Sequence, residues 1–400
     1  MSRPVKPLAM AGELTHDAVE EARSAGAKGF LELGEWFGEK WRRRGWFLEN
    51  MTARKFGNLC LAGAEYVTKR DKMRAWPLVV KIDISPLCNL KCTVCVHADP
   101  GEEEYLQKQS FDSSQRMSVA EFRKIIDEIK GKSMAVSLYY LGDPLVHPNL
   151  DEMCSIARKG GLNVHVSTNF SFTWNDDRIR RHVESGVTHL TVCVDGLSQE
   201  KYALTRVGGK IKTVLSNLER LLAYRNSKNL TYPKVEVQYL VFDHNKDEMQ
   251  PALELFRKLG VDQVVFKEGS QDNWASKVYH TEAPKKNRLL PQCHWPHFFM
   301  VVKYNGEVIP CCLHRTGDQY ARGADTRAVG NAFKSSIREI WNSDTYRQLR
   351  RVVSNPPRAH AEPGSDRGYC DACPQIYDVS VEELAGKLAV IQPLRRADPA

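Results

Sequence analysis

The chain lacks the long hydrophobic runs that membrane-spanning proteins need. None of its apolar stretches approaches the ~20 residues that cross a bilayer as a helix, and Met1-Ser-Arg-Pro is not followed by the apolar core of a signal peptide. A strong excess of one charge is also lacking, because the formal net charge of the 400 residues is +8 and is spread along the chain. This mild charge does not indicate nucleic acid, and we predict no nucleic-acid partner. We expect a globular cytoplasmic protein.

Cysteine is not scarce, and in a cytoplasmic protein it points away from disulfides. Eleven cysteines indicate metal or thiol chemistry instead. Three of them occur in Ile82-Asp-Ile-Ser-Pro-Leu-Cys88-Asn-Leu-Lys-Cys92-Thr-Val-Cys95, in a loop directly after an apolar strand-like run. A C-x3-C-x2-C loop can hold three corners of a cubane iron–sulfur cluster and leave the fourth iron open for a small molecule. The alternative is a zinc knuckle or buried thiols, although zinc sites usually show two Cys/His pairs.

From residue 78 onward the pattern alternates between strands and helices. The strand-like runs are Leu78–Ile84, Met134–Leu141, Leu162–Ser167, His189–Val194, Lys234–Val241 and Val261–Phe266. Helix-like runs lie between them, for example Val119–Lys130 and Lys212–Arg225. This rhythm predicts a parallel α/β sheet, either a barrel or an open doubly wound sheet. Chemistry in a parallel barrel belongs at the C-terminal ends of the strands, and the cysteine loop follows such an end.

The cysteine loop and the strand–helix repeats together resemble the radical S-adenosylmethionine (SAM) superfamily. The resemblance implies a partial (β/α)6 TIM-like barrel and a [4Fe–4S] cluster whose open iron binds the amino and carboxylate groups of SAM. Reduction of the cluster, by a flavodoxin- or ferredoxin-type donor, then cleaves SAM to a 5′-deoxyadenosyl radical. That radical removes a hydrogen atom from the substrate.

Turns after the predicted strands resemble the family's SAM-binding segments. Leu141-Gly142-Asp143-Pro144-Leu145 is similar to the Gly-Gly-Glu motif whose backbone holds the SAM amino group, with Asp143 in place of Glu. Arg206 resembles the partner of the SAM carboxylate, which an Arg fork suits. Val94 stands where an aromatic residue often contacts adenine, and its smaller size weakens that contact. The alternative to each of these assignments is an ordinary turn residue or a surface salt bridge. The residues thus assigned to SAM are Gly142, Asp143, Pro144, Ser167, Asn169, Asp195, Arg206 and Val94.

Four later cysteines form a second group. Cys293 is followed by twelve residues, Gly306, four residues and Cys311, and Cys370-Asp-Ala-Cys373 comes later. This C-x12-G-x4-C…C-x2-C pattern resembles the Twitch form of the SPASM extension of radical SAM proteins. Four cysteines suffice for one auxiliary [4Fe–4S] cluster with every iron capped, which suits electron acceptance or a structural role. A structural zinc site is the alternative. Cys312 could replace Cys311, but the G-x4-C spacing favours Cys311.

Another cysteine lies within the fourth predicted strand. Strand alternation places Thr191, Cys193 and Asp195 on one face, and a polar residue at the strand end indicates that this face borders the barrel mouth. A thiol there could donate a hydrogen atom to a substrate radical, as in radical SAM epimerases, whereas a small core residue is the alternative. Lys267 and Glu268 end the sixth predicted strand and are candidate base or substrate contacts on position alone.

The resemblance covers about residues 78–376 and determines the cofactor chemistry better than the substrate. Twitch enzymes include an aminocyclitol dehydrogenase and sugar epimerases. The first hypothesis is therefore dehydrogenation or epimerisation of a sugar, aminocyclitol, glycoside or similar hydroxylated small molecule. The second is a ribosomal-peptide or protein maturase of the SPASM type, although such enzymes often begin with a strand-containing peptide-binding module that this sequence lacks. The third is a non-catalytic zinc-binding protein, which leaves the open three-cysteine loop unexplained.

The sequence divides into four predicted regions. These are a helical N-terminal extension at 1–76, the barrel at 77–270, the auxiliary-cluster (Twitch/SPASM) domain at 271–376, and a C-terminal helix and tail at 377–400.

The N-terminal region contains aromatic residues beside basic ones. Apolar residues share one helical face at Phe30, Leu33, Phe37 and Trp41. They precede Arg42-Arg-Arg-Gly-Trp46-Phe47, and Arg54 and Lys55 follow. Segment 30–56 is therefore a candidate for peripheral contact with an anionic membrane, and a helix packed on the barrel or on a second subunit is the alternative.

Overall fold

The computed structural model describes residues 49–93, 95, 97, 114–269, 277–311, 328–362, 368–370 and 373–383. Its main feature is a nine-stranded sheet in the order β10-β9-β8-β1-β2-β3-β4-β5-β6. Six consecutive strands of this sheet pair in parallel: β1 (Val79–Ile82), β2 (Ala135–Ser137), β3 (Asn163–Thr168), β4 (His189–Cys193), β5 (Lys234–Val241) and β6 (Gln263–Glu268). These are the six strands predicted from the sequence, within a few residues at each end.

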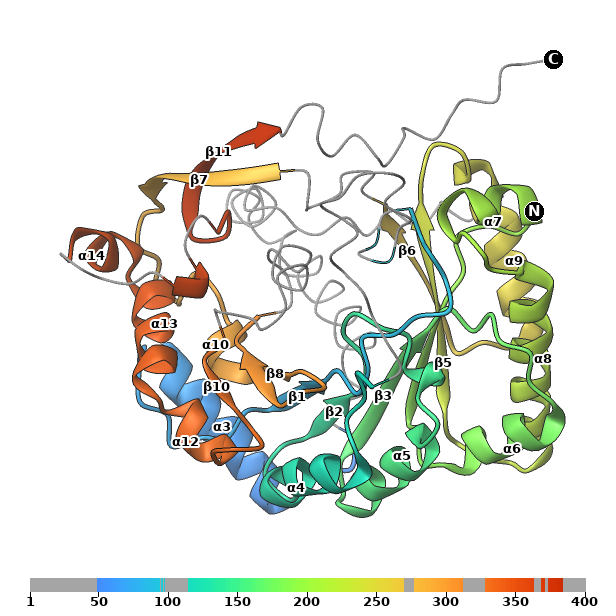
Figure 1. Cartoon of the computed structure of the whole chain (residues 1–400), viewed down its shortest axis with the longest axis horizontal. Helices are drawn as coiled ribbons and strands as arrows, with labels where there is room; N and C mark the ends of the chain where they lie inside the picture. Colours follow the sequence, from blue (N-terminus) through green and yellow to red (C-terminus); the bar gives the residue numbers. More distant parts are fainter. Residues whose placement is uncertain are drawn as a thin grey trace, which may run out of the picture.

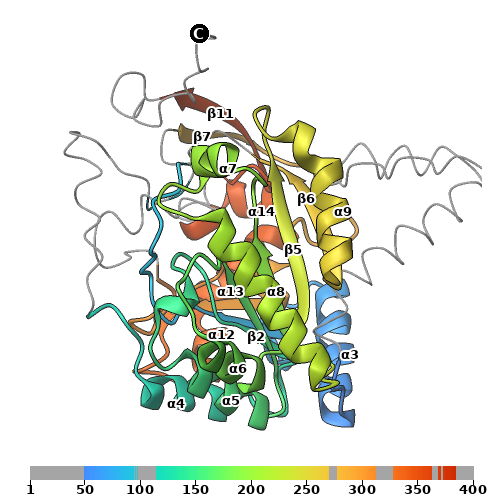
Figure 2. The same ribbon diagram turned by 90° about the vertical axis from the view of Figure 1, so that its right-hand side faces the viewer.

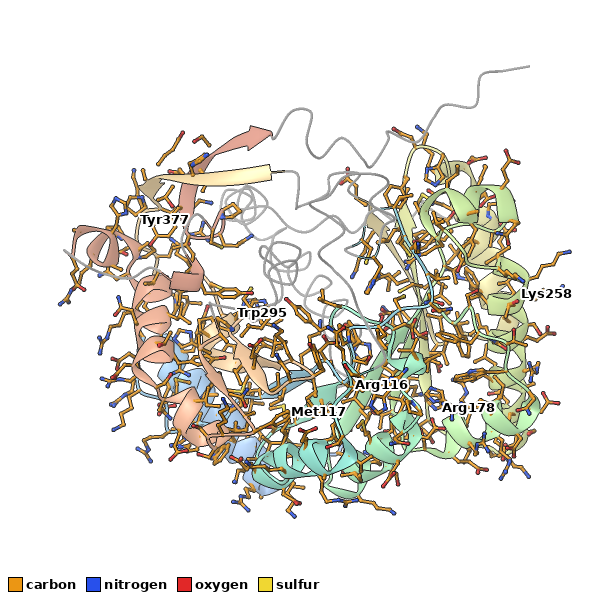
Figure 3. The ribbon with its side chains drawn as sticks, in the orientation of Figure 1. Arg116, Met117, Arg178, Lys258, Trp295 and Tyr377 are labelled. Carbon is orange, nitrogen blue, oxygen red and sulfur yellow. The ribbon has the colours of Figure 1, made fainter. Side chains whose placement is uncertain are left out.

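Helices connect these strands and cover the outer face of the sheet (Figure 1). They are α4 (Val119–Ile129), α5 (Leu150–Lys159), α6 (Asp176–Glu184), α7 (Gln199–Thr205), α8 (Ile211–Ser227) and α9 (Met249–Leu259). In α4, a capping box joins Ser118 and Glu121, and the buried residues recur at helical spacing from Phe122 to Ile129. Figure 2 shows α8 and α9 beside β5, and Figure 3 shows Lys258 of α9 projecting away from the sheet. The partial (β/α)6 barrel predicted from the sequence is confirmed.

The auxiliary region is continuous with this sheet. Strand β8 (Phe299–Val302) runs parallel to β1, with Val79 opposite Phe299, and β9 (Glu307–Ile309) and β10 (Gly330–Asn331) follow antiparallel. The turn between β8 and β9 contains Gly306 at φ +82°, where an added Cβ would lie 2.6 Å from the Phe333 ring. The glycine of the C-x12-G-x4-C motif is therefore needed for the turn of a hairpin. Because of this hairpin, strands and helices no longer alternate here, although the strands still belong to the main sheet.

Short helices surround this C-terminal part of the sheet. They are α10 (Trp295–Phe298), α12 (Ile337–Trp341), α13 (Asp344–Ser354) and α14 (Pro356–Ala361), followed by the 3-10 turn η6 (Gly368–Cys370). In Figure 1 they stand on the left, at the opposite end of the sheet from α8 and α9 on the right.

The C-terminal segment differs from the prediction of a helix from residue 377. Residues Tyr377–Glu383 form strand β11, which pairs antiparallel with β7 (Lys277–Pro284) in a separate two-stranded sheet. The reason lies in the segment Tyr-Asp-Val-Ser-Val-Glu-Glu, where apolar and polar residues alternate with the period of a strand rather than of a helix. The remainder of the predicted tail, 384–400, lies outside the described residues.

The N-terminal region is described from residue 49, so the aromatic residues at 30–47 lie outside the described part. Helix α3 (Ala53–Val67) is capped at its N-terminus by Thr52, whose hydroxyl accepts a hydrogen bond from the Lys55 amide at 3.3 Å. The Lys55 side chain is 2% exposed and donates to the carbonyl oxygens of Asn50 and Gly161. Lys55 is therefore not available to a membrane surface. Within the described residues, no helix combines the length and the apolar character needed to cross a membrane.

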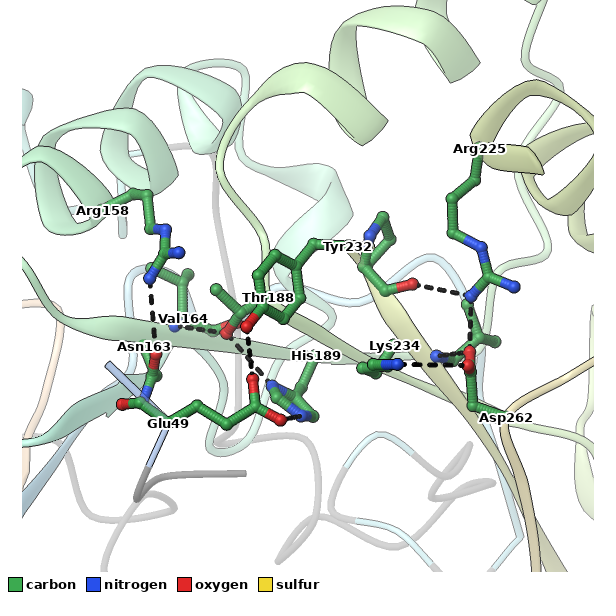
Figure 4. A network of polar contacts seen from close by, with 12 residues as sticks. Glu49, Arg158, Asn163, Val164, Thr188, His189, Arg225, Tyr232, Lys234 and Asp262 are labelled. Atoms are coloured by element: carbon green, nitrogen blue, oxygen red, sulfur yellow. Dashed lines mark hydrogen bonds and ion pairs between the residues drawn. The ribbon is translucent and has the colours of Figure 1, made fainter. Parts of the chain in front are cut away.

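The chain just before α3 is attached to the N-terminal ends of the strands (Figure 4). The Glu49 carboxylate accepts a hydrogen bond from the Tyr232 hydroxyl at 2.6 Å and lies 3.8 Å from His189 Nε2. The Glu49 carbonyl oxygen accepts from Asn163 Nδ2 at 2.5 Å. Because His189 begins β4 and Asn163 begins β3, this network lies at the opposite end of the barrel from the cysteine loop.

Candidate functional site

The three-cysteine loop borders a cavity of about 250 Å³ at the C-terminal ends of the strands. The residues that line it are Cys88, Cys92, Cys95, Tyr139, Leu141, Gly142, Asp143, Ser167, Thr168, Asn169, Cys193, Asp195, Thr205, Arg206 and Leu240. The predicted cluster ligands and all predicted SAM-binding residues except Pro144 and Val94 are in this set. Pro144 adjoins Asp143 at the start of a 3-10 turn, and Val94 lies outside the described residues. Sequence reasoning missed Tyr139 and Leu240, although both follow strand alternation from Ser137 and Gln238.

Backbone hydrogen bonds hold the cysteine loop against its neighbours. The amides of Lys91 and Thr93 donate to Val207 and Thr205 at 3.0 and 3.1 Å, and the Asp143 amide donates to Leu87 at 2.8 Å. The loop is therefore fixed by the turn after β2 and by the segment after α7.

The donor chemistry of the loop fits an iron–sulfur cluster. Burial is the main cause that raises the pKa of Cys88 to about 12 and that of Cys92 to about 11, although the Arg206 charge opposes the rise at Cys92. Thiolates in such a place need a cationic group to remain charged, and iron supplies it. Within the described ranges, no three or more His, Cys, Asp or Glu side chains stand close enough to share a single metal ion. A cubane accepts a wider spacing, because each thiolate binds a different iron.

Gly142 is required by the close approach of two chain segments. A Cβ at this position would lie 2.2 Å from the Ser85 carbonyl oxygen and 2.4 Å from that of Leu87. These distances are far inside van der Waals contact, so no other residue fits without moving the cysteine loop. The glycine thus brings the turn after β2 directly against the segment that carries Cys88.

The Asp143 side chain is directed into the protein rather than into the cavity. It is 4% exposed and accepts hydrogen bonds from the Leu145 amide at 3.0 Å, the Asn169 amide at 2.7 Å and the Thr168 hydroxyl at 2.8 Å. Burial raises the pKa of Asp143 to about 6, and these hydrogen bonds oppose the rise. The carboxylate therefore ties the turn after β2 to the end of β3, where Asn169 Nδ2 lies 3.8 Å from Cys88 Sγ.

Arg206 is held at the cavity by Asp195. Its Nε donates to Asp195 Oδ2 at 2.6 Å, and its Nη1 lies 3.9 Å from Cys92 Sγ. Asp195 is 1% exposed and also accepts a hydrogen bond from the Leu240 amide at 3.0 Å. Burial acts to lower the pKa of Arg206, but attraction to Asp195 and the neighbouring thiols raises it. Asp195 was predicted to bind SAM directly, and its observed contacts orient Arg206.

Cys193 lies in the cavity, whereas Lys267 and Glu268 do not line it. Cys193 Sγ is 3.8 Å from Ser167 Oγ, and burial raises the pKa of this thiol. Lys267 Nζ donates to Gln238 Oε1 at 2.7 Å, and Lys267 is paired in register with the cavity-lining Leu240. Glu268 is exposed.

Polar residues continue along the strand face that carries the cavity. Ser137 Oγ lies 3.3 Å from His165 Nδ1, and His165 Nε2 lies 2.9 Å from Thr191 Oγ1. The Thr191 hydroxyl in turn donates to Glu236 Oε1 at 3.5 Å. Burial lowers the pKa of His165 to about 3, so the ring is neutral. We call Ser137, His165, Thr191, Glu236, Gln238 and Lys267 the polar row; it was not recognised in the sequence, where its members are separated by apolar neighbours.

The other four predicted ligands come together from distant segments. The pKa of Cys370 is raised by burial and then by the charges of Cys373, Cys293 and Cys311, which places all four in one neighbourhood. The Cys373 amide donates to the Cys370 carbonyl oxygen at 3.3 Å, and the Tyr369 hydroxyl donates to that of Cys311 at 3.1 Å. Four partly buried thiols in one neighbourhood fit a fully capped cluster. Cys312 lies outside the described residues.

Two family comparisons agree with these two cysteine groups. The chain matches the Radical SAM superfamily over residues 82–256 and the SPASM iron–sulfur cluster-binding domain over residues 293–374. The first domain implies a [4Fe–4S] cluster with SAM, and the second implies auxiliary iron–sulfur clusters. The non-catalytic zinc-binding alternative is therefore not supported.

Two relatives and one solved structure are similar to this chain at low identity. The tungsten-containing aldehyde ferredoxin oxidoreductase cofactor-modifying protein of Pyrococcus furiosus is 24% identical over 324 residues, covering 72% of this chain and 88% of the relative. The AdoMet-dependent heme synthase of Methanosarcina barkeri is 22% identical over 347 residues, covering 77% and 89%. Streptococcus suis SuiB bound to its precursor peptide SuiA has a similar fold, with a TM-score of 0.52 and 12% identity over 75% of this chain and 73% of SuiB. The chain therefore contains a radical SAM domain followed by a SPASM iron–sulfur cluster-binding domain.

Proposed function

We propose that the protein oxidises or epimerises a hydroxylated small molecule, such as a sugar, aminocyclitol or glycoside, after removal of hydrogen from a carbinol carbon. When bound, SAM and the [4Fe–4S] cluster supply the radical that takes this hydrogen. The observation that carries the proposal is the polar row beside the cavity, together with the Cys193 thiol inside it. The names of the two relatives, a cofactor-modifying protein and a heme synthase, also favour a substrate smaller than a protein.

Cys88, Cys92 and Cys95 would hold the cluster, and residues from two strand ends would hold SAM. The backbone at Gly142 would bind the amino group, and Arg206, oriented by Asp195, would bind the carboxylate. The ion pair with the buried Asp195 keeps this partly exposed cation in one geometry, so the site is preorganised for an anionic group.

The polar row offers the donors and acceptors that several hydroxyl groups need. A neutral His165 can donate at one ring nitrogen and accept at the other, while Glu236 accepts and Lys267 donates. Lys267 is included because it lies beside Leu240 in the register. Glu268 is not included, because it is exposed and strand alternation turns it to the opposite face.

Cys193 is proposed as a hydrogen-atom donor. Its raised pKa keeps the thiol protonated at neutral pH, so an S–H bond is available. In epimerisation this bond breaks and a C–H bond forms on the opposite face of the carbon; one electron and one proton from the reducing system then restore the thiol. In oxidation the substrate radical instead loses a proton and an electron, and the four SPASM cysteines would hold the electron acceptor.

Turnover in heavy water tests the proposal and separates the two outcomes. We would first measure 5′-deoxyadenosine release by the anaerobically reconstituted, reduced protein, and then screen sugars, aminocyclitols and peptides. Epimerisation is supported if the product carries deuterium at an inverted carbon and this label is absent from the product of Cys193→Ala. The control is Cys60→Ala, which changes an exposed cysteine and should keep the label. An unlabelled ketone supports oxidation. Turnover of peptides alone would overturn the proposal in favour of a maturase.

A further inference from the structure

Helix α13 presents two buried polar side chains beside the four SPASM cysteines. It packs against α10, which follows Cys293, and against η6, which contains Cys370. Tyr346 and Arg350 lie one helical turn apart on α13, and both are 0% exposed. A fully buried arginine is rare, because taking its charge out of water is costly unless an anion compensates it.

Protein groups accept hydrogen bonds from only some of the donors of the Arg350 guanidinium. Nε donates to the Pro296 carbonyl oxygen and Nη1 to that of Asp71, both at 2.8 Å. The guanidinium also lies 4.4 Å from the centre of the Trp341 ring. Among the described residues, no carboxylate forms an ion pair with Arg350, and Nη2 has no hydrogen-bond partner. Burial lowers the pKa of Arg350 to about 10, so the group remains a cation at neutral pH.

Tyr346, on the same side of α13, also has a buried polar atom without a hydrogen-bond partner. Its ring lies 5.1 Å from the Arg350 guanidinium, and its hydroxyl has no partner within the described part of the chain. The charge of Cys311 contributes, after burial, to raising the pKa of Tyr346.

Arg350 also acts near a second ligand. Burial lowers the pKa of His297 most, and the charge of Arg350 lowers it further. The His297 side chain lies at the Cys293 backbone. Arg350 therefore acts on Tyr346 and His297, and its helix packs against α10, which follows Cys293, and against η6, which contains Cys370.

We propose that Arg350 and Tyr346 tune the auxiliary iron–sulfur site, Arg350 through its buried positive charge and Tyr346 through a hydrogen bond from its hydroxyl to the cluster's sulfur. Four thiolates on an iron–sulfur cluster would form an anionic group, which would add to the partial compensation that the charges of Asp71 and Glu65 give Arg350. Net charge and hydrogen bonds to sulfur set the reduction potential of such clusters. A nearby cation favours the more negative, reduced state, so both residues raise the potential and make the site a better electron acceptor. This inference rests on the SPASM cofactor and not on the identity of the substrate.

A redox titration of the auxiliary site, followed by electron paramagnetic resonance, tests the proposal without substrate. The full-length protein is used with Cys88, Cys92 and Cys95 replaced by alanine, so that only the auxiliary iron remains. Arg350→Gln is expected to shift the midpoint to a more negative potential, and Arg350→Lys to restore most of the shift. Tyr346→Phe is expected to shift it in the same direction by less. The control is Arg351→Gln, which changes an exposed neighbour on the same helix and leaves the potential unchanged.

The outcomes separate tuning from a purely structural role. Equal potentials in Arg350→Gln and Arg351→Gln, with unchanged iron content and melting temperature, would overturn the role of Arg350. If Arg350→Gln loses its iron, the other two variants decide. A parental potential in Tyr346→Phe would refute the proposed hydrogen bond. Loss of iron in Arg350→Lys as well would mean that Arg350 only supports the fold. A shift in these variants supports the proposal even if no sugar or cyclitol is ever turned over.

Discussion

The two cysteine sites of this protein are built in opposite ways. The first takes Cys88, Cys92 and Cys95 from one short loop and faces a cavity of about 250 Å³ whose lining includes Asp195 and Arg206. The second collects Cys293, Cys311 and the Cys370–Cys373 pair from separate segments and lies against the buried face of α13. A site that must admit SAM and a substrate needs an open ligand position and polar walls. A site that passes electrons needs neither, and burial with a fixed nearby charge controls its potential.

The largest effect should come from removing ligands at each site in turn. Cys88→Ala, Cys92→Ala or Cys95→Ala should abolish SAM cleavage, because the open iron is lost. Cys370→Ala or Cys373→Ala should remove only part of the iron and leave SAM cleavage measurable. Iron content and 5′-deoxyadenosine release would be assayed together. Cleavage retained in any of the first three variants would contradict the ligand assignment.

A second large effect is expected where the open site depends on a close backbone approach. Gly142→Ala places a Cβ 2.2 Å from the Ser85 carbonyl oxygen, so the cysteine loop must move. A displacement on the order of 1 Å costs about 100-fold in rate. Gly57→Ala is the matched control, because its Cβ meets nothing within 4 Å on helix α3. Similar rates in both variants would show that the loop adapts freely.

A smaller loss is expected from the buried ion pair that orients the SAM partner. Asp195→Asn leaves Arg206 without its charged partner and should weaken SAM binding roughly 10- to 100-fold, the range for a hydrogen bond to a charged group. Equilibrium dialysis with SAM measures this. Asp247→Asn breaks the exposed pair with Lys201 and serves as the control, with SAM affinity unchanged. Equal affinities in the two variants would argue that Arg206 does not bind the carboxylate.

The smallest effect should come from the far end of the barrel. Tyr232→Phe removes the hydrogen bond to Glu49 and should cost about 1 kcal/mol of the free energy of unfolding, with SAM cleavage intact. Thermal unfolding of the reconstituted protein measures the loss. Tyr224→Phe, which removes an exposed hydrogen bond to Glu184, should change stability less. A loss of cleavage in Tyr232→Phe would mean that the two ends of the barrel are coupled.

Local patterns predicted some features and long-range pairings decided others. The six parallel strands were predictable because runs such as Lys234–Val241 are short and place apolar residues at every second position. The two cysteine groups could be proposed from the sequence because their spacing is typical of cluster-binding loops, and their role as ligands stays a prediction. The pairing of β8 with β1 was not, since parallel register between distant segments leaves no local signal. The same holds for Arg350, whose sequence neighbours Arg347 and Arg351 look alike but whose side chain alone is fully buried.

The pairing of β1 with β8 has a consequence for biogenesis. Val79 finds its partner Phe299 only after more than half of the chain has been synthesised. Until then one edge of β1 offers unpaired backbone groups to any neighbouring chain, at a stage when the first cysteine loop has already been made. Completion of the SPASM region is therefore also the event that protects the nascent barrel from aggregation. Closing a contact of such long sequence separation is slow, and chaperone assistance would be most valuable during that interval.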